Sequence, residues 1–529
     1  MSSKAKKAKK NTIVSGWEML APAMEYVLAL TMAAMCVAVS FYSKEGYNQI
    51  GNAKFAAYKA VMVIGFSIFL MMGAAYLLYF LRQKKVWNLS VTDGFVLAYL
   101  LFSTISVVSG GFYKDALWGY FGWNMGWMSQ LSFVLIYLAI SRFGKYYRNI
   151  LTTFLVSSAV VFLIAVLHRM LIDPIGFYEG LEGYQMAQFL STMGQTTWYA
   201  SYLVVALPIG MAVFLFSEKK WQSILGGIYI AVGFASLVTQ NSDSAYFALA
   251  GFMLIFFLFC IEKRETLNRF VEACTIFFAA GKVMYFLMQI HPNPDLEYDF
   301  VTDIMLNRKI TWVLLGLCLL LDLFLYVRKN RPYSAVRMQW VKWMALIGAA
   351  ACLIVMVGLI VLQSKGTLSG RLGEALGTVA YFNWDHEWGN GRGRIWEFAV
   401  SVFAEESLPH KLFGLGPDCF SSYLEVNYSE EVSLFWVNKV LTNAHNEWLT
   451  TLINVGIFGA VAYIGIFVTA IRRFAKAWQK DYLLAGVAAS AVSYMAYNFF
   501  CYQQVCCTPF VFLLLGIGEY LLRQERMEK

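Results

Sequence analysis

The sequence has few charged residues for its length. Only 14% of its 529 residues are Asp, Glu, Lys or Arg, whereas 59% are hydrophobic. Soluble domains average about 25% charged and roughly 45–50% apolar residues. A water-soluble protein of this size needs a charged surface, and this composition does not supply one. The low charge therefore excludes a soluble protein and indicates a membrane protein.

The apolar residues occur in blocks of about 17–25, close to the roughly 20 residues that a helix needs to cross the hydrocarbon core. The alternating segments of about ten residues that spanning strands require are absent, and helices satisfy every backbone polar group in lipid. The sequence therefore predicts an all-α polytopic membrane protein with about fourteen transmembrane helices. These are expected near residues 22–42, 56–81, 92–110, 128–141, 149–167, 197–216, 221–238, 244–261, 268–290, 311–327, 339–363, 446–471, 482–499 and 505–522.

Lysine and arginine gather on alternate connections between the apolar blocks. Basic groups occur, for example, at 142–148, 219–220, 263–269 and 472–480. Because cytoplasmic loops carry an excess of Lys and Arg, these connections and both termini are predicted to be cytoplasmic. No connection on this side exceeds about fifteen residues, so no cytoplasmic nucleotide-binding domain is expected.

The motifs of several cofactor chemistries are missing. The chain has no GxxxxGK[ST] phosphate loop, no GxGxxG in a βαβ context, and no CxxC pair or His/Cys cluster at metal spacing. The nine cysteines are scattered, which favours free thiols over disulfides. The net charge of +9 follows the membrane topology and does not indicate a nucleic-acid surface. We therefore expect no cofactor, no metal site and no nucleic-acid partner.

The longest connection, 364–444, is predicted to lie on the outer face. Connections of this length inside a compact bundle are usually functional or disordered, and this one is too rich in aromatic and apolar residues for disorder. The expected organisation is a membrane bundle of about eleven helices (1–363), an extracytoplasmic segment with interfacial helices (364–444) and a membrane bundle of about three helices (445–529).

The sequence predicts the local structure of several parts of the outer segment. Residues 389–394, Gly-Asn-Gly-Arg-Gly-Arg, form a flexible basic turn, and 395–406 has the apolar spacing of a helix on the membrane surface. Residues 413–417, Phe-Gly-Leu-Gly-Pro, predict a tight turn. The Asn443 side chain is expected to cap the helix that follows, placing His445 in its first turn. The helix dipole there disfavours imidazolium, which predicts a neutral histidine able to accept a proton.

The order of these motifs resembles the O-antigen ligase and polymerase superfamily. Upstream, 194–203 looks like that family's Gly-Asn-x-Asn stretch, and 118–126 resembles its early outer loop. The residues that carry the resemblance best are Gly391-Arg392 with Trp396, then Phe-Gly-Leu-Gly-Pro at 413–417, Ala-His-Asn-Glu-Trp-Leu at 444–449, and Gly456 with Gly459.

The resemblance implies a glycan transferase of the bacterial cytoplasmic membrane. Members move a glycan from an undecaprenyl-diphosphate carrier to an acceptor hydroxyl on the outer face, the acceptor being a glycan or a lipid-linked molecule. By resemblance, Arg392 would bind the carrier diphosphate, and His445 would orient or deprotonate the acceptor hydroxyl. Transfer would invert the anomeric centre in one displacement, without a metal. The expected substrate-binding residues are Arg392, Arg394, Asn446, Gln195 and Trp198, although an aromatic anchor in the membrane belt is the simpler reading of Trp198.

One departure concerns the second phosphate contact of the family. Where an arginine is expected near the outer start of a middle helix, this sequence has Asp243. Arg394, Arg371 or Arg169 would then supply the second cation, and Arg394 is favoured because it lies next to Arg392.

The main alternative is a flippase that transports lipid-linked oligosaccharides or polysaccharides. Such a transporter is expected to show two related halves with broken helices at matching positions, and no duplication of that kind is visible. The motifs do not distinguish ligase from polymerase, because both use the same donor chemistry. The sequence also does not identify the sugars or the acceptor.

Overall fold

The computed structural model describes residues 2–82, 88–330, 333, 335–436 and 440–527 and is almost wholly helical over them. Ten of the described helices are long and apolar enough to cross a membrane. They are α1 (Ser2–Phe41, apolar from Leu20), α2 (Ile50–Arg82), α3 (Val91–Ser109), α6 (Tyr147–Arg169), α8 (Thr196–Phe216), α9 (Lys220–Thr239), α11 (Arg264–Ile290), α13 (Ile310–Val327), α14 (Ala335–Ser364) and α20 (Glu447–Ala477).

Shorter apolar helices complete the bundle. They are α5 (Trp127–Phe143), α10 (Ser244–Cys260) and α21 (Leu483–Tyr497). With α22 (Thr508–Met527), these helices coincide with all the apolar segments predicted from the sequence. The helical polytopic architecture is therefore confirmed, whereas the number of crossings and the side on which the termini lie stay predictions.

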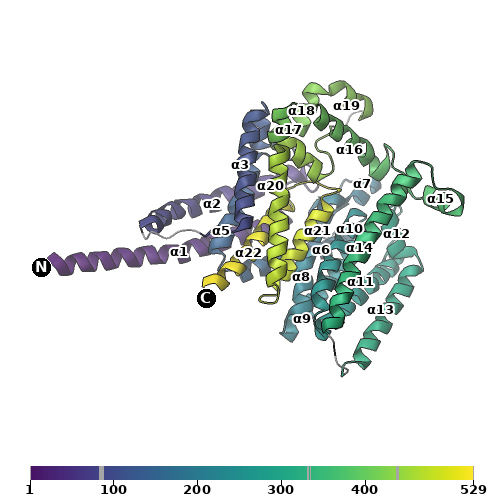
Figure 1. Ribbon diagram of the computed structural model, residues 1–529, viewed down its shortest axis with the longest axis horizontal. Helices are drawn as coiled ribbons and strands as arrows, with labels where there is room; N and C mark the ends of the chain where they lie inside the picture. The colour runs from purple at the N-terminus through teal and green to yellow at the C-terminus, as the bar shows by residue number, and fades with distance from the viewer. Residues whose placement is uncertain (1, 83–87, 331–332, 334, 437–439, 528–529) are drawn as a thin grey trace.

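Burial differs sharply among the long helices. In α8, 89% of the most apolar stretch is buried, against 6% in α13 and 0% in α14. α8 therefore lies at the centre of the bundle, packed against α9 and α21, while α20 packs against α3 and α21. α13 and α14 stand at one edge (Figure 1). An apolar surface this extensive suits contact with lipid.

Short helices form a separate layer at one end of the bundle, where α16–α19 lie together (Figure 1). Those between α14 and α20 are α15 (Gly370–Gly377), the 3₁₀ helix η1 (Ala380–Phe382), α16 (Trp388–Glu405), α17 (Leu408–Phe413), α18 (Phe420–Asn427) and α19 (Ser429–Phe435). Short elements from other connections are α4 (Tyr113–Trp118), α7 (Gly183–Gln188), α12 (Phe300–Asn307) and the antiparallel pair β1 (Phe189–Leu190) and β2 (Gly194–Gln195). We call α15 to α19, η1 and the connections between them the outer layer, after the side on which they are predicted to lie; this layer is structured, as its composition predicted.

The outer layer has its own small apolar core. Ile395, Ala399 and Val402 form the buried face of α16, and they pack in one cluster with Leu415 and Phe420. Part of the apolar stripe of 395–406 therefore packs on protein, and the position of this helix at the membrane surface stays a prediction. The periodicity identified a helix correctly, but the partner of the apolar face is set by tertiary packing.

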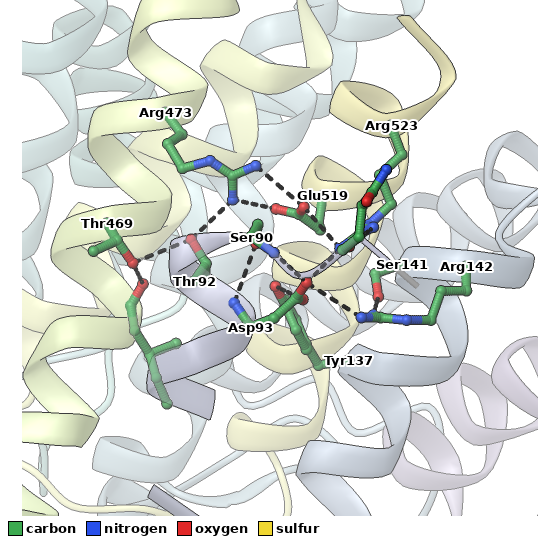
Figure 2. A network of polar contacts seen from close by, with 12 residues as sticks. Ser90, Thr92, Asp93, Tyr137, Ser141, Arg142, Thr469, Arg473, Glu519 and Arg523 are labelled. Atoms are coloured by element: carbon green, nitrogen blue, oxygen red, sulfur yellow. Dashed lines mark hydrogen bonds and ion pairs between the residues drawn. The ribbon is translucent and has the colours of Figure 1, made fainter. Parts of the chain in front are cut away.

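A buried ion network joins the bundle helices at the end away from the outer layer (Figure 2). The Asp93 carboxylate at the start of α3 pairs with Arg142 of α5 at 3.2 Å and with Arg523 of α22. Arg473 of α20 pairs with Glu519 of α22. Because Asp93 and Glu519 are almost completely buried, these pairs fix four helices that are distant in sequence.

Candidate functional site

His445 precedes the first turn of α20. The N-cap residue is Asn446, whose Oδ1 accepts hydrogen bonds from the N–H groups of Trp448 (3.0 Å) and Leu449 (3.2 Å). Asn443 instead accepts the N–H of His445 at 2.9 Å. The prediction that Asn443 caps the helix and that His445 lies within it was wrong. The chain turns sharply at His445, where φ is 47°, and both asparagines hold that turn.

α20 is interrupted at Gly456, where φ is 69° and ψ is −178°, a conformation that is essentially restricted to glycine. The outer layer docks at this break. The N–H of Leu415 donates to the carbonyl oxygen of Ile453 (3.1 Å), and the N–H of Gly416 donates to that of Asn454 (2.8 Å). The turn predicted at 413–417 lies slightly later, at Gly416–Cys419, where the N–H of Cys419 donates to the carbonyl oxygen of Gly416 at 3.2 Å. Residues 415 and 416 tie the outer layer to the helix that follows His445.

The imidazole of His445 contacts an aromatic cluster. Its ring meets that of Tyr502 edge-on, with 5.3 Å between ring centroids. Tyr502 in turn accepts a hydrogen bond from Trp198 Nε1 at 3.0 Å and meets Trp123 edge-on at 4.7 Å. Tyr502 therefore connects His445 with Trp198, whose substrate-binding role stays a prediction, and Tyr502 itself is a neighbour that the motifs did not reveal.

Arg392 approaches the same place from the outer layer. It follows a turn in which Gly389, Asn390 and Gly391 all have positive φ, so the predicted turn is confirmed. Its guanidinium donates to the carbonyl oxygen of Gly389 at 2.6 Å and to that of Phe500 at 3.3 Å. An arginine has five N–H donors, so these two bonds leave capacity for a phosphate.

One connection therefore brings together the two residues singled out by the sequence. Residues 498–507 join α21 to α22; Phe500 holds Arg392, and Tyr502 contacts His445. Burial, followed by the nearby charge of Arg392, lowers the pKa of His445 to about 4. The imidazole is therefore neutral at pH 7, as expected. The cause is burial and Arg392 rather than a place in the first turn of a helix.

Three other predicted substrate-binding residues occupy different surroundings. Arg394 lies 3.4 Å from the carboxylate of Glu387, whose side chain is 80% exposed. Gln195 is exposed and directly precedes α8. Asn446 is buried, with its oxygen in the cap of α20.

The other arginines considered for the second cation differ in accessibility. Arg371 is exposed on α15. Arg169 is completely buried. Its guanidinium donates to three backbone carbonyls, those of Thr239 (2.7 Å), Ala187 (2.8 Å) and Gln240 (3.0 Å). Those bonds leave Arg169 little capacity to bind a ligand.

Asp243, which stands where the family's arginine is expected, anchors the outer layer. Its carboxylate accepts the N–H of Val301 at 3.1 Å and the hydroxyl of Tyr381 at 2.9 Å. Its own N–H donates to Asp299 at 3.4 Å. Burial raises the pKa of both carboxyls, that of Asp299 to about 6, while the charge of Arg392 opposes the rise at Asp299. Asp243 thus helps to hold the carboxyl group of Asp299 close to Arg392.

Three tryptophans lie beside Arg392. The centroid distances are 4.9 Å between Trp384 and Trp388 and 5.4 Å between Trp388 and Trp396. Trp396 also stacks on Phe500, the residue that binds Arg392, at 6.1 Å. Phe500 therefore connects the two predicted residues, Arg392 through its carbonyl oxygen and Trp396 through its ring.

Comparison with known families agrees with this arrangement. Residues 300–464 match the model of a family described as O-antigen ligase. The match includes Arg392, residues 413–417 and His445, and it confirms the superfamily resemblance drawn from the motifs. At the level of the family, it supports a multi-pass membrane protein that processes lipid-linked glycans. None of the curated proteins matches the chain.

Proposed function

We propose that this protein of the O-antigen ligase type transfers a glycan from an undecaprenyl-diphosphate carrier to an acceptor hydroxyl. The reaction would occur at the outer face of the bacterial cytoplasmic membrane. The observation that supports the proposal is the approach of Arg392 and His445 to the single connection between α21 and α22. A cation for the leaving group and a neutral imidazole for the nucleophile then lie within one site.

In the proposed step, the acceptor oxygen attacks the anomeric carbon and inverts it. The bond from that carbon to the carrier oxygen breaks, and its electron pair leaves with the diphosphate. Arg392 binds the diphosphate, since a guanidinium matches phosphate oxygens bidentately. Stabilisation of the developing charge is often the largest catalytic contribution. No metal takes part in the proposed step.

His445 is proposed to accept a hydrogen bond from the acceptor hydroxyl and to direct its oxygen at the anomeric carbon. We assign the second phosphate contact to Arg394, because its ion pair with Glu387 is exposed and such pairs are weak. Trp198 and Gln195 are proposed to contact the substrate. Asn446 is also proposed to act at the substrate site. It caps α20 directly after His445 and so fixes the position of that residue.

The test is glycan transfer by the purified protein in lipid vesicles that contain an undecaprenyl-diphosphate-linked glycan and an acceptor. We expect Arg392→Ala and His445→Ala to lose at least roughly 100-fold in rate, the usual range for charge-stabilising and acid–base groups. His386→Ala is a matched control from the same outer segment and should retain the rate. Folded Arg392→Ala or His445→Ala variants with normal turnover would contradict the assigned roles.

A further inference from the structure

The proposed transfer releases one proton. When the acceptor oxygen bonds to the anomeric carbon, the electron pair of the broken bond leaves with the diphosphate, and the hydroxyl proton must be taken up. His445 holds a proton poorly near neutral pH, because burial and the charge of Arg392 lower its pKa to about 4. A group with higher proton affinity is therefore needed close to His445.

A cavity of about 40 Å³, lined by both polar and apolar residues, includes two neighbours of His445 in its wall. Tyr502, whose ring contacts the His445 ring, lines it, and so does Asn443, which accepts the N–H of His445. This volume holds roughly three water-sized groups. The cavity therefore suits hydroxyl groups or water but is too small for a sugar ring.

Asp418 lies on the wall of this cavity. Its Oδ2 accepts two backbone hydrogen bonds, from the N–H of Tyr120 at 2.9 Å and from that of Met125 at 2.8 Å. Both of these bonds are made by Oδ2, and the Asp418 carboxyl forms part of the cavity wall. Burial raises the pKa of Asp418 to about 7, although the two backbone N–H groups oppose the rise.

Glu447 supplies a second carboxylate to the same cavity. Its Oε1 accepts the hydroxyl of Thr451 at 2.6 Å, and its Oε2 accepts the N–H of Gln503 at 2.7 Å. The negative charges of Glu447 and Asp115 both increase the proton affinity of Asp418. Two enclosed carboxylates do not both ionise readily, so the pair is suited to taking up one proton.

The remaining polar groups of the cavity are neutral. Gln130 donates to Gln503 at 2.8 Å and accepts the hydroxyl of Tyr99 at 2.9 Å. Burial raises the pKa of Tyr502, which keeps that hydroxyl protonated. Among the described residues that line the cavity, the acceptors able to gain a proton near neutral pH are therefore the two carboxylates.

We propose that Asp418 takes up the acceptor's proton during transfer, through water in this cavity, while His445 orients the hydroxyl. The inference rests on the proposed function. An O–H bond forms at the Asp418 carboxylate as the acceptor O–H bond breaks, and the proton passes to water after the products leave. Glu447 is a positioning residue, because its charge maintains the proton affinity of Asp418.

The test is the pH profile of transfer by the full chain in vesicles, with saturating donor and acceptor. The wild-type rate should rise with pH through about 7, as Asp418 becomes ionised. Asp418→Asn retains a side-chain oxygen for Tyr120 and Met125, and asparagine tolerates the φ of 61° at this position. We expect this variant to lose at least roughly tenfold in rate and to lose the rise near pH 7.

Glu425→Gln is the matched control. Glu425 is exposed, accepts the hydroxyl of Tyr120 at 2.7 Å and does not line the cavity, so its variant should retain the rise. Glu447→Gln should move the rise to lower pH, because it removes a negative charge beside Asp418. A purely structural role would leave the position of the rise unchanged.

The outcomes separate this inference from the proposed function. A wild-type protein that transfers glycan at a rate independent of pH between about 5.5 and 8.5 would overturn the role of Asp418 and leave the proposed function standing. A folded Asp418→Asn variant with the wild-type profile would do the same. If that variant does not fold, the role of Asp418 is tested by the pH profile of the wild-type protein and by the shift of that profile in Glu447→Gln. Absence of transfer by wild-type protein would instead contradict the proposed function.

Discussion

The N–H of Gly416 donates to the carbonyl oxygen of Asn454 at 2.8 Å, across the interruption of α20 at Gly456. A side chain at Gly456 would place its Cβ 2.4 Å from the carbonyl carbon and oxygen of Leu412. The backbone of the outer layer thus occupies the space that a helix side chain would need. This contact sets where the outer layer sits relative to His445, and the first prediction follows from it.

Substitution of Gly456 by alanine should both destabilise the protein and impair transfer. The strained φ and the clash with Leu412 together should cost about 3 kcal/mol or more. Thermal unfolding in detergent and the transfer rate measure the two effects. Gly348→Ala is the control: no atom lies within 4 Å of its Cβ position on α14, so helix propensity should raise stability by up to about 1 kcal/mol. Equal stability of the two variants would contradict the docking role of the break.

Asn446→Ala should lower stability by about 1 kcal/mol, because it removes the N-cap of α20. Asn446→Asp retains an oxygen that can accept the N–H groups of Trp448 and Leu449 and should unfold at the wild-type temperature. The transfer rate of the aspartate variant then reports on the substrate role by itself. If Asn446→Ala is as stable as the wild-type protein, the cap contributes little to stability.

Asp93→Asn should be strongly destabilising. It leaves Arg142 and Arg523 without their buried carboxylate, and breaking a buried pair in this way typically costs about 3–5 kcal/mol. The comparison is Asp303→Asn, which removes a carboxylate paired with the exposed Arg308 and should cost less than about 1 kcal/mol. Unfolding temperatures within error of each other would show that the network of Figure 2 contributes little.

The contribution of Asp299 to stability should fall as pH rises from about 4 to 6, because burial raises its pKa from 3.8 to about 6. In this range the folded Asp299 binds more proton than the unfolded one, so its deprotonation favours unfolding. The loss is at most roughly 3 kcal/mol and should level off above the folded pKa. His445 and Asp418 also have shifted pKa values, so the test is the difference between the wild-type protein and Asp299→Asn, which should change with pH over this range. Unfolding temperatures of the two proteins at several pH values test this, and parallel curves would refute it.

The outer placement of α16 can be tested by labelling. Val400 is 54% exposed on that helix, so a cysteine there should react with a membrane-impermeant maleimide added to intact cells from outside. Labelling of the unmodified protein, with its nine free thiols, gives the background. Reaction only after the cytoplasmic side has been opened would reverse the predicted topology and exclude the proposed site on the outer face.

Much of the site's local structure could be predicted, because it depends on short-range chemistry. The glycines around Asn390 predicted a turn, and the spacing of Ile395, Ala399 and Val402 predicted a helix. The choice between Asn443 and Asn446 as cap was missed. Both residues have the same side chain, and the difference depends on the path of the chain around His445. Local propensity does not determine that path.

The neighbours of the predicted residues were beyond sequence reasoning for another reason. Phe500 and Tyr502 follow α21 and reach Arg392 and His445 only through packing of the bundle. Asp243 and Tyr381 meet across 138 positions. Such contacts have no periodic signal in the chain. The aspartate at 243 was recognised only as a departure, and its role in anchoring the outer layer became visible with its partners.

The connection that holds both Arg392 and His445 lies outside residues 300–464, the part that matches the family. The matched region and the candidate site therefore have different boundaries. A fragment trimmed to the matched residues would retain the arginine and the histidine but lose Phe500, which binds one, and Tyr502, which packs on the other. Chimeras that exchange specificity between related proteins should accordingly carry the last two helices along with the outer layer.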